Sequence, residues 1–266
     1  MQVVDPLRDD TELRRLAGSV RAPGAAEPFG AYMFRHDEPG AELARHVERG
    51  VFLEAFGNTP ELLREEYDRY ERSSVFIVVL DHLRNVPAGA IRVIVPSRAG
   101  FKSLDDIEPV WGVPARDLVE RTGIALDPNR TWDVATLAVE PEYRGTLARG
   151  LVTMGLYQSL VLSARACGID WLVAILDMPV FRLLRWKLRM VMVGYKGIGP
   201  LPYLGSAASL PAWCDLVGAE RRYLETDLNL HGVIFEGVGL EPALRRVDLP
   251  GVDRRVAWGG GMAAGL

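Results

Sequence analysis

The stretch TWDVATLAVEPEYRG, residues 131–145, combines residues that could do chemistry with a turn that could hold a ligand. It reads as a buried strand, 131–139, that runs into a turn and then opens a helix. Two acids, Asp133 and Glu140, stand near the two ends of this strand. A helix N-terminus presents free backbone N–H groups and the positive end of the helix dipole, so it suits a phosphate. The expected phosphate-binding residues at this junction are Arg144, Gly145, Thr146, Arg149 and Gly150.

A second group of ionisable residues lies earlier in the chain. Asp68 and Glu71 stand three residues apart, which on a helix places both on one face, and a solvated charged face is one interpretation of the pair. Arg92 lies in the apolar stretch GAIRVIVPS, and an unpaired arginine is rarely buried. We therefore expect Arg92 either to pair with Asp68 or Glu71, or to bind a substrate carboxylate through two of its N–H groups.

Hydrophobic patterning indicates the elements that must position these residues. It predicts strands at 31–35, 73–81, 89–97, 131–139, 169–177 and 191–199, with a last strand near 231–238. It predicts helices at 10–18, 41–57, 60–69, 114–121, 147–167 and 179–190. The helix at 147–167 bridges two strands, which makes that strand pair parallel, whereas the rest of the sheet is expected to be antiparallel. The expected fold is a mixed α/β domain with a single sheet, 31–240, preceded by an N-terminal arm, 1–30, and followed by a C-terminal tail, 241–266.

The composition argues against several classes of protein. The 266 residues are 48% apolar and carry a net charge of −4, which is enough for a proper core and gives no electrostatic reason to expect nucleic acid. No apolar run approaches the roughly 18 residues of a membrane span, and the N-terminus lacks the apolar segment of a signal peptide. The two cysteines, Cys167 and Cys214, and the four scattered histidines show no metal-ligand spacing. We therefore expect a cytoplasmic protein without a metal site.

The order of these elements resembles the GNAT superfamily of acyltransferases, and within it the branch of the acyl-homoserine-lactone synthases and N-acyl amino acid synthases. Four stretches carry the resemblance: EYDRYERSSVFIVVLD (66–81), AGAIRVIVPS (88–97), TWDVATLAVEPEYRG (131–145) and GIDWLVAILDMPVFRLLRWKLRMVMVGYKGIGP (168–200). The match spans roughly residues 31–235. It implies a central, mostly antiparallel sheet with one splayed parallel strand pair and helices on both faces.

The resemblance implies acyl transfer from a thioester to an amine. Such a reaction needs a base for the amine proton, donors for the developing oxyanion and a proton for the leaving thiolate. Asp133 is the first candidate for the base and Glu140 the second, while Tyr195 or Tyr203 could protonate the thiolate. The backbone N–H groups of Leu137, Ala138 and Val139 are the candidates for the oxyanion and donor site, and Asp68, Glu71, Arg92 and Thr136 those for substrate binding. The acyl donor would be acyl-CoA or acyl-phosphopantetheine.

Two departures from the family pattern shape the expected substrates. Leu147 stands where the general phosphate loop resembling R-x-x-G-x-G/A has its middle glycine, which weakens the case for ordinary coenzyme A binding. Thr136 stands where homoserine-lactone synthases carry an arginine, which argues against S-adenosylmethionine as the amine donor. The acceptor is then a small amine such as an amino acid. An ordinary acetyl-CoA-dependent acetyltransferase and a non-catalytic acyl-thioester-binding protein remain the alternatives.

Three arginines recur on the predicted helix 179–190. Arg182, Arg185 and Arg189 stand at helical spacing, opposite the apolar residues Phe181, Leu184 and Leu188. The polar face of an amphipathic helix explains this pattern. The alternative is a docking face for an acidic acyl carrier protein, because complementary charges steer such partners together.

Overall fold

The structure, a computed structural model, describes residues 10–144, 150–187 and 189–246. In these ranges nine strands form one sheet in the order β6-β8-β5-β4-β3-β2-β1-β9, with β7 paired to β8. The strands are β1 (Phe29–Arg35), β2 (Ser74–Asp81), β3 (Val86–Ile94), β4 (Thr131–Val139), β5 (Trp171–Asp177), β6 (Val193–Gly194), β7 (Leu201–Tyr203), β8 (Ser206–Asp215) and β9 (Leu244–Arg246). The predicted mixed, mostly antiparallel sheet is confirmed.

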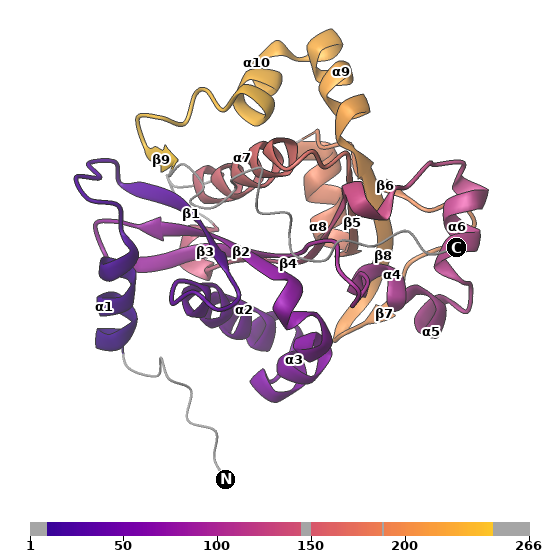
Figure 1. The fold of residues 1–266 in the computed structure, drawn as a ribbon, viewed down its shortest axis with the longest axis horizontal. Coiled ribbons are helices and arrows are strands. Elements are labelled where there is room, and N and C mark those ends of the chain that lie inside the picture. The colour runs from indigo at the N-terminus through magenta and orange to yellow at the C-terminus, as the bar shows by residue number, and fades with distance from the viewer. Residues whose placement is uncertain (1–9, 145–149, 188, 247–266) are drawn as a thin grey trace.

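Helices cover both faces of this sheet (Figure 1). The α-helices are α1 (Asp10–Val20), α2 (Ala41–Phe56), α3 (Pro60–Tyr67), α4 (Lys102–Asp105), α5 (Ile107–Trp111), α6 (Ala115–Thr122), α7 (Leu151–Ala166), α8 (Met178–Arg182), α9 (Leu216–Thr226) and α10 (Leu228–His231). Short 3₁₀ turns occupy Asp68–Ser73, Pro128–Arg130 and Pro141–Tyr143, and π-helical turns occupy Leu183–Lys187 and Gly232–Glu236. Helices α1, α2 and α3 lie on one side of the sheet, and α7, α9 and α10 lie on the other (Figure 1).

The parallel pair β4–β5 separates soon after it starts. Only residues 131–133 of β4 pair with residues 171–173 of β5. Beyond that point β5 pairs with β8 along its whole length, whereas β4 continues against β3. In the described part of the chain, the edge of β4 from 134 to 139 that faces β5 therefore has no strand partner. Beside the start of this gap, the register between β3 and β4 shifts after Arg92: Arg92 pairs with Thr136 and Val93 pairs with Val134, so Ala135 is the extra residue of a β-bulge in β4.

The core has one main cluster on each face of the sheet. On the α7 side, Trp132, Leu156 and Leu160 are almost fully buried. On the α2 side, buried positions of α2 recur at Ala44, Val47, Glu48 and Val51, the spacing of one helix face. A glutamate therefore stands within an otherwise apolar stripe, which is unusual unless the carboxylate is paired.

Two of the predicted strands differ in the structure. The strand expected at 191–199 is limited to β6, and the segment 231–238 is helical rather than a strand. In the latter, His231, Ile234 and Phe235 are buried at helical spacing, which puts all three on one face, close to α7. The sequence reading also missed β8, which contains Pro211, a residue that usually marks an edge or a break.

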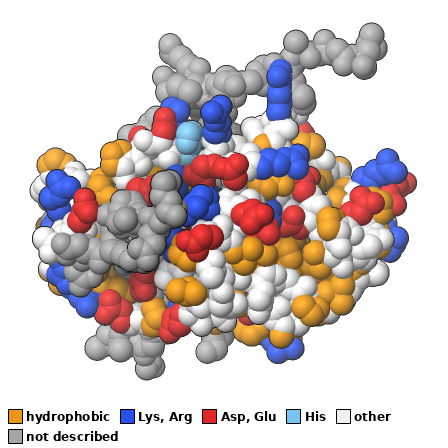
Figure 2. Space-filling view, turned by 90° about the horizontal axis from the view of Figure 1, so that it is seen from below, with side chains coloured by type: hydrophobic (Ala, Val, Ile, Leu, Met, Phe, Trp, Pro, Cys, Tyr) orange, Lys and Arg blue, Asp and Glu red, His pale blue; other side chains and the backbone are white. Residues whose placement is uncertain are grey.

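The two terminal segments contribute elements of their own. Leu13 and Ala17 of α1 are buried in the α2-side cluster. β9 pairs with β1 in parallel, so the sheet has a second parallel strand pair in addition to the predicted pair β4–β5. None of the helices within the described ranges is long and apolar enough to cross a membrane. Figure 2, seen from below Figure 1, shows acidic and basic side chains interspersed over that face rather than one continuous basic surface.

Candidate active site

The gap between β4 and β5 opens into a cavity of about 100 Å³. Residues 134–137 of β4 and 174–177 of β5 form its two edges. Phe52, Phe56, Tyr67, Tyr203 and Leu204 complete the lining on the α2 side, and Tyr157, Leu160, Leu172, Val180, Leu184, Met190 and Met192 complete it towards α7 and α8. Ser206 and Ser209 of β8 also line it. The cavity therefore passes through the sheet at the point where the two strands separate.

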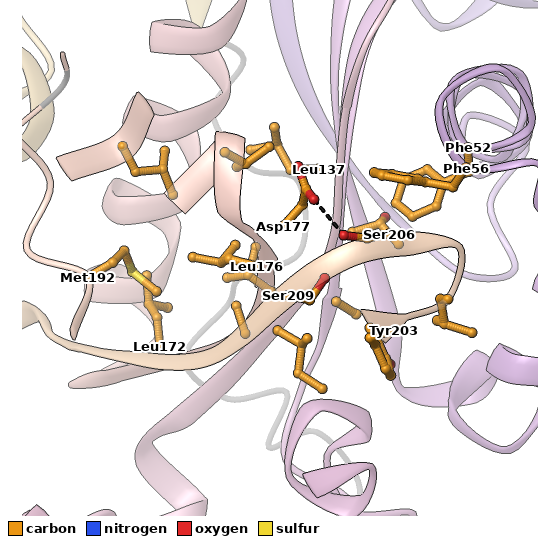
Figure 3. Close-up of a pocket in the computed structure, with 18 of the residues that line it drawn as sticks. Phe52, Phe56, Leu137, Leu172, Leu176, Asp177, Met192, Tyr203, Ser206 and Ser209 are labelled. Carbon is orange, nitrogen blue, oxygen red and sulfur yellow. Dashed lines mark hydrogen bonds between the residues drawn. The ribbon is translucent and has the colours of Figure 1, made fainter. Parts of the chain in front are cut away.

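Most of this lining is apolar. In Figure 3, Phe52 and Phe56 lie at one end and Met192 and Leu172 at the other. Several polar groups of the lining are already paired, as Asp177 is, whose carboxylate accepts a hydrogen bond from the Ser206 hydroxyl at 2.5 Å (Figure 3). Such a space suits a hydrocarbon chain, since burying apolar surface is favourable at roughly 25 cal/mol per Å².

Asp133 is completely buried beside the base of the gap. Its Oδ2 accepts a hydrogen bond from the Ser103 backbone N–H at 2.8 Å, and its Oδ1 accepts one from the Ser103 hydroxyl at 2.6 Å. Burial raises the pKa of Asp133 to about 7, because it outweighs these hydrogen bonds and the nearby Lys102, which all favour the charged form. Asp133 does not line the cavity, so its predicted role as the base stays a prediction.

Glu140 directly follows β4, at the opposite end of the strand from Asp133. Burial raises the pKa of Glu140 to about 7, against the lowering effect of Arg144. Its side chain is outside the cavity lining as well. Two carboxyl groups with pKa values near neutrality therefore flank β4, and the structure does not bring them together at one point.

Arg92 is buried in a network of charged groups above the α2 face of the sheet. Its guanidinium donates two hydrogen bonds to Glu48, at 3.0 and 2.6 Å, and one to Glu71 at 2.7 Å. Thr136 lines the cavity, and its hydroxyl donates a hydrogen bond to the carboxylate of the same Glu48 at 2.7 Å. Burial acts to raise the pKa of Glu71, but Arg92 and Arg45 outweigh it and the net pKa is lowered. The predicted pairing of Arg92 with Glu71 is present, whereas Asp68 is exposed and outside this network.

A second buried network adjoins the cavity through two tyrosines. Tyr67 and Tyr203 line the cavity, and the Tyr203 hydroxyl donates to Asp106. Lys102, whose side chain is only 3% exposed, donates to Asp106 at 2.6 Å and to Glu66 at 2.5 Å. Two carboxylates around one ammonium give this side of the cavity an excess of negative charge, which favours a bound cation such as a protonated amine.

Tyr195 lies in a separate cluster with Ile107 and Leu118. Its hydroxyl is buried and has no hydrogen-bond partner among the described residues, and burial raises its pKa above the usual value. It does not line the cavity. Of the two predicted proton donors for the thiolate, only Tyr203 therefore borders the space where a thioester would lie.

The predicted phosphate site falls partly outside the described residues. Gly145, Thr146, Leu147 and Arg149 lie in the segment that the structure does not describe. Arg144 donates its Nε–H to the Val139 carbonyl at 2.6 Å, and Gly150 precedes α7 in the left-handed conformation with φ of 82°. Leu137 lines the cavity, whereas the side chains of Ala138 and Val139 are buried on either side of the sheet.

Three solved structures share this arrangement of elements. FeeM, an N-acyl amino acid synthase from uncultured soil microbes, aligns with a TM-score of 0.54 and 16% identity over 74% of this chain and 94% of its own. BjaI, a CoA-dependent acyl-homoserine lactone synthase solved with SAM and isopentyl-CoA, aligns with a TM-score of 0.53 and 16% identity over 86% and 96%. LasI, an acyl-homoserine lactone synthase, aligns with a TM-score of 0.50 and 15% identity over 72% and 91%.

The chain shares the fold of these synthases. This finding matches the branch that the sequence motifs resemble. No protein-family profile and no curated protein matches the sequence. Among the described residues, no group of three or more His, Cys, Asp or Glu side chains could hold a metal ion.

Three arginines in and after α8 and the following π-helical turn face outward. Arg182, Arg185 and Arg189 are exposed, while Phe181 and Leu184 are buried, as the amphipathic pattern predicts; Leu188 lies outside the described residues. Arg185 and Arg189 border a surface hollow that Trp186, 78% exposed, also lines. Arg189 is 3.3 Å from the carboxylate of Asp227.

Sequence reasoning missed several residues of this site. The residues that were not predicted are Glu48, Tyr67, Lys102, Asp106 and Tyr157. Tyr67 and Tyr157 line the cavity, Glu48 and Asp106 bond to residues that line it, and Lys102 bonds to Asp106. One signal was available for Glu48, because it stands in the apolar stripe of α2 and a buried arginine needs a carboxylate. The contacts of Lys102 and Asp106 depend on how the loop after β3 folds over the sheet, which no local pattern indicates.

Proposed function

We propose that this protein is an N-acyltransferase that moves an acyl group from an acyl thioester to the amine of a small molecule such as an amino acid. The observation that carries the proposal is the apolar cavity between the separated strands β4 and β5. The likeness to BjaI, which was solved with isopentyl-CoA, and to FeeM, an N-acyl amino acid synthase, supports it.

The size and lining of the cavity favour an acyl group longer than acetyl. An apolar cavity of about 150 Å³ holds a benzene molecule, and the space here is about 100 Å³. An acetyl group would fill only a small part of it with one methyl group. Met190 and Met192 line the far end, and flexible thioether side chains adapt readily to chains of different shape.

The chemistry follows from the groups that border the gap. The amine nitrogen attacks the thioester carbonyl carbon, the carbon–sulfur bond breaks, and the amine proton passes to a base while the thiolate gains a proton. Backbone N–H groups on the unpaired edge of β4 would hold the carbonyl oxygen as its negative charge develops. Leu137 and Val139 would supply them, because N–H groups alternate between the two edges of a strand and the N–H of Glu140 bonds to Ala88 of β3. The donor's phosphate would bind at the start of α7, near Arg144 and Gly150.

Two groups compete for the role of base. Asp133 has a pKa near neutrality, which suits a base, but Ser103 occupies both of its oxygens. Tyr203 and Asp106 form a hydrogen-bonded pair whose tyrosine borders the cavity, so this pair could pass a proton from the amine or to the thiolate. The buried networks of Lys102 and Arg92 would fix the position of the acceptor.

The test is thiol release from acyl-CoA thioesters of increasing chain length, with a pool of amino acids, for wild type, Asp133→Asn and Tyr203→Phe. Amine-dependent release that prefers a multi-carbon chain is expected. Collapse in one variant alone assigns the proton-transfer role to that residue. Release from acetyl-CoA alone would favour an ordinary acetyltransferase, and binding without release would show that the fold is used without catalysis.

A further inference from the structure

A buried histidine in the turn after β2 joins the N-terminal arm, residues 10–28, to the sheet. This arm consists of α1 and the loop that follows it. His82 is 3% exposed, and both of its ring nitrogens are hydrogen-bonded. Its Nδ1 lies 2.8 Å from the backbone carbonyl oxygen of Glu27 in the arm, and its Nε2 lies 2.8 Å from the hydroxyl of Tyr32 on β1.

The hydrogen bonds around His82 fix the neutral form of its ring. A carbonyl oxygen only accepts, so Nδ1 carries a hydrogen and donates it to Glu27. Nε2 then accepts from the Tyr32 hydroxyl, whose oxygen in turn accepts from the backbone N–H of Ala22 at 3.1 Å. Each hydrogen of this chain therefore has one acceptor, and both ends of the chain lie in the arm.

Protonation of His82 would disrupt this chain at Tyr32. A hydrogen on Nε2 points at the Tyr32 oxygen, and the hydrogen of that hydroxyl then loses its acceptor, because Tyr32 is 4% exposed and has no further hydrogen-bond partner in the described ranges. The ring packs directly against Gly30, where an added Cβ atom would lie 2.4 Å from Nε2. The ring has little room to turn away, and a buried charge beside an unpaired hydroxyl is costly.

The charged groups around this pair come from several elements. They are Arg14, Arg21 and Glu27 of the arm, Asp81 and Arg84 of the turn, and Arg245 of β9. Burial is the largest effect and lowers the pKa of His82, and Arg21 acts in the same direction. The hydrogen bond to the Glu27 carbonyl and the carboxylates of Glu27 and Asp81 act to raise it, and the net pKa lies below the usual value.

The same turn anchors the arm through backbone groups. The His82 N–H donates to the Pro28 carbonyl at 2.7 Å, and the His82 carbonyl accepts from Arg21 at 3.0 Å. Arg14 of α1 donates to the carbonyl of Arg84 at 3.1 Å. Every one of these contacts joins the arm to residues 82–84, so the position of His82 determines how the loop of the arm is held.

The arm covers a helix that belongs to the candidate site. Leu13 and Ala17 of α1 are buried in the cluster on the α2 side of the sheet, where α1 lies beside α2 (Figure 1). Helix α2 carries Glu48, which binds Thr136, and Phe52, which lines the cavity. Opening of the arm would therefore uncover the helix that supplies one wall of the site.

We infer that His82 is an acid-sensitive switch: its neutral ring holds the arm closed, and its protonation opens the arm. In the open form His82 has the ordinary histidine pKa of about 6.5, whereas the closed form lowers it. Below that pH the open form binds a proton that the closed form does not, so a falling pH favours opening. The inference goes beyond the proposed function and does not depend on it.

The experiment is hydrogen exchange of the full chain, followed by mass spectrometry between pH 5.5 and pH 7.5 and corrected for the intrinsic pH dependence of exchange. Uptake of one proton on opening increases the open fraction by up to about tenfold over this range, so the protection of the segment 10–28 should fall by that factor at pH 5.5. Peptides from α7 should keep their protection, which separates opening of the arm from global unfolding.

Two variants and one spectroscopic measurement assign the effect to His82. His82→Gln takes up no proton in this range, so the protection of its arm should not change with pH. His36→Gln removes a half-buried histidine outside the arm and should keep the pH dependence of wild type. NMR of histidine-labelled wild type should show the His82 ring becoming protonated as the arm opens, and this titration decides the question if His82→Gln does not fold.

Four results would overturn the inference. The first is protection of the wild-type arm that does not change with pH, and the second is an equal pH dependence in His82→Gln. The third is a His82 ring that stays neutral while the arm opens. The fourth is a parallel loss of protection in α7, because acid would then unfold the whole chain rather than release the arm.

Discussion

Replacing Asp133 with asparagine tests the electrostatics of the site directly. The asparagine has nearly the same shape, and its amide oxygen can still accept the hydrogen bond from the Ser103 backbone N–H. Burial raises the carboxyl pKa from 3.8 to about 7, which corresponds to about 4 kcal/mol at roughly 1.4 kcal/mol per pH unit. Asp133 is fully buried, so solvent screening does not reduce this figure much.

The sign of the effect follows from proton uptake. Between pH 4 and pH 7 the folded chain keeps a proton on Asp133 that the unfolded chain has released. The stabilisation from this proton is complete below about pH 4 and is lost as the pH rises through 7. Asp133→Asn has no such dependence, so its stability relative to wild type should rise by about 2.5 kcal/mol between pH 5 and pH 8.

The assay is urea unfolding of both proteins at several pH values, with equal m-values as the check on two-state comparison. Asp68→Asn removes the same formal charge from an exposed position and serves as the control. A stability difference that stays flat with pH would refute the reasoning. It would mean that the Ser103 hydrogen bonds and Lys102 keep Asp133 ionised throughout, and a residue ionised throughout would not produce a rate change near pH 7.

Three further predictions concern the network, the cavity and the surface. Glu48→Ala should lower the free energy of unfolding, measured by urea titration, by roughly 3–5 kcal/mol, because it leaves the buried Arg92 without the carboxylate that accepts two of its hydrogen bonds. The control is Glu42→Ala on the same helix, which removes a partly exposed ion pair and should cost at most about 1 kcal/mol in the same titration. Ala174→Leu, which adds bulk to the wall of the gap, should reduce octanoyl transfer about tenfold or more while acetyl transfer changes little; equal loss for both chains would contradict an acyl-binding role for the cavity. Arg185→Glu should slow transfer from an acyl carrier protein at low salt and leave acyl-CoA turnover unchanged, with the exposed Arg116→Glu as the charge-matched control; equal effects of the two reversals would argue against a docking face.

Local patterns were sufficient for much of the fold. The β-branched runs of β2, β3 and β4 predicted strands within a few residues of their observed ends, and Thr59, Pro60 and Gly57 marked helix boundaries through their own side-chain and backbone properties. The two incorrect predictions, the missed strand β8 and the strand expected at 231–238, share a cause: the local sequence there does not favour the element that forms. β8 contains a proline, and the segment after α9 has an apolar composition that suits a strand or a buried helix turn equally.

The amino-acid sequence by itself determined which apolar elements contain a charged residue and where a strand leads into a helix. Both features depend on the spacing of apolar residues and on backbone preferences, which are properties of residues close together in the chain. Only the tertiary structure decided that Arg92 binds Glu48, a partner 44 residues away, and that Ser103 encloses Asp133. It also decided the cavity. β5 pairs with β8 along its full length but with β4 over only three residues, and no local pattern in β4 or β5 specifies which neighbour each edge will choose.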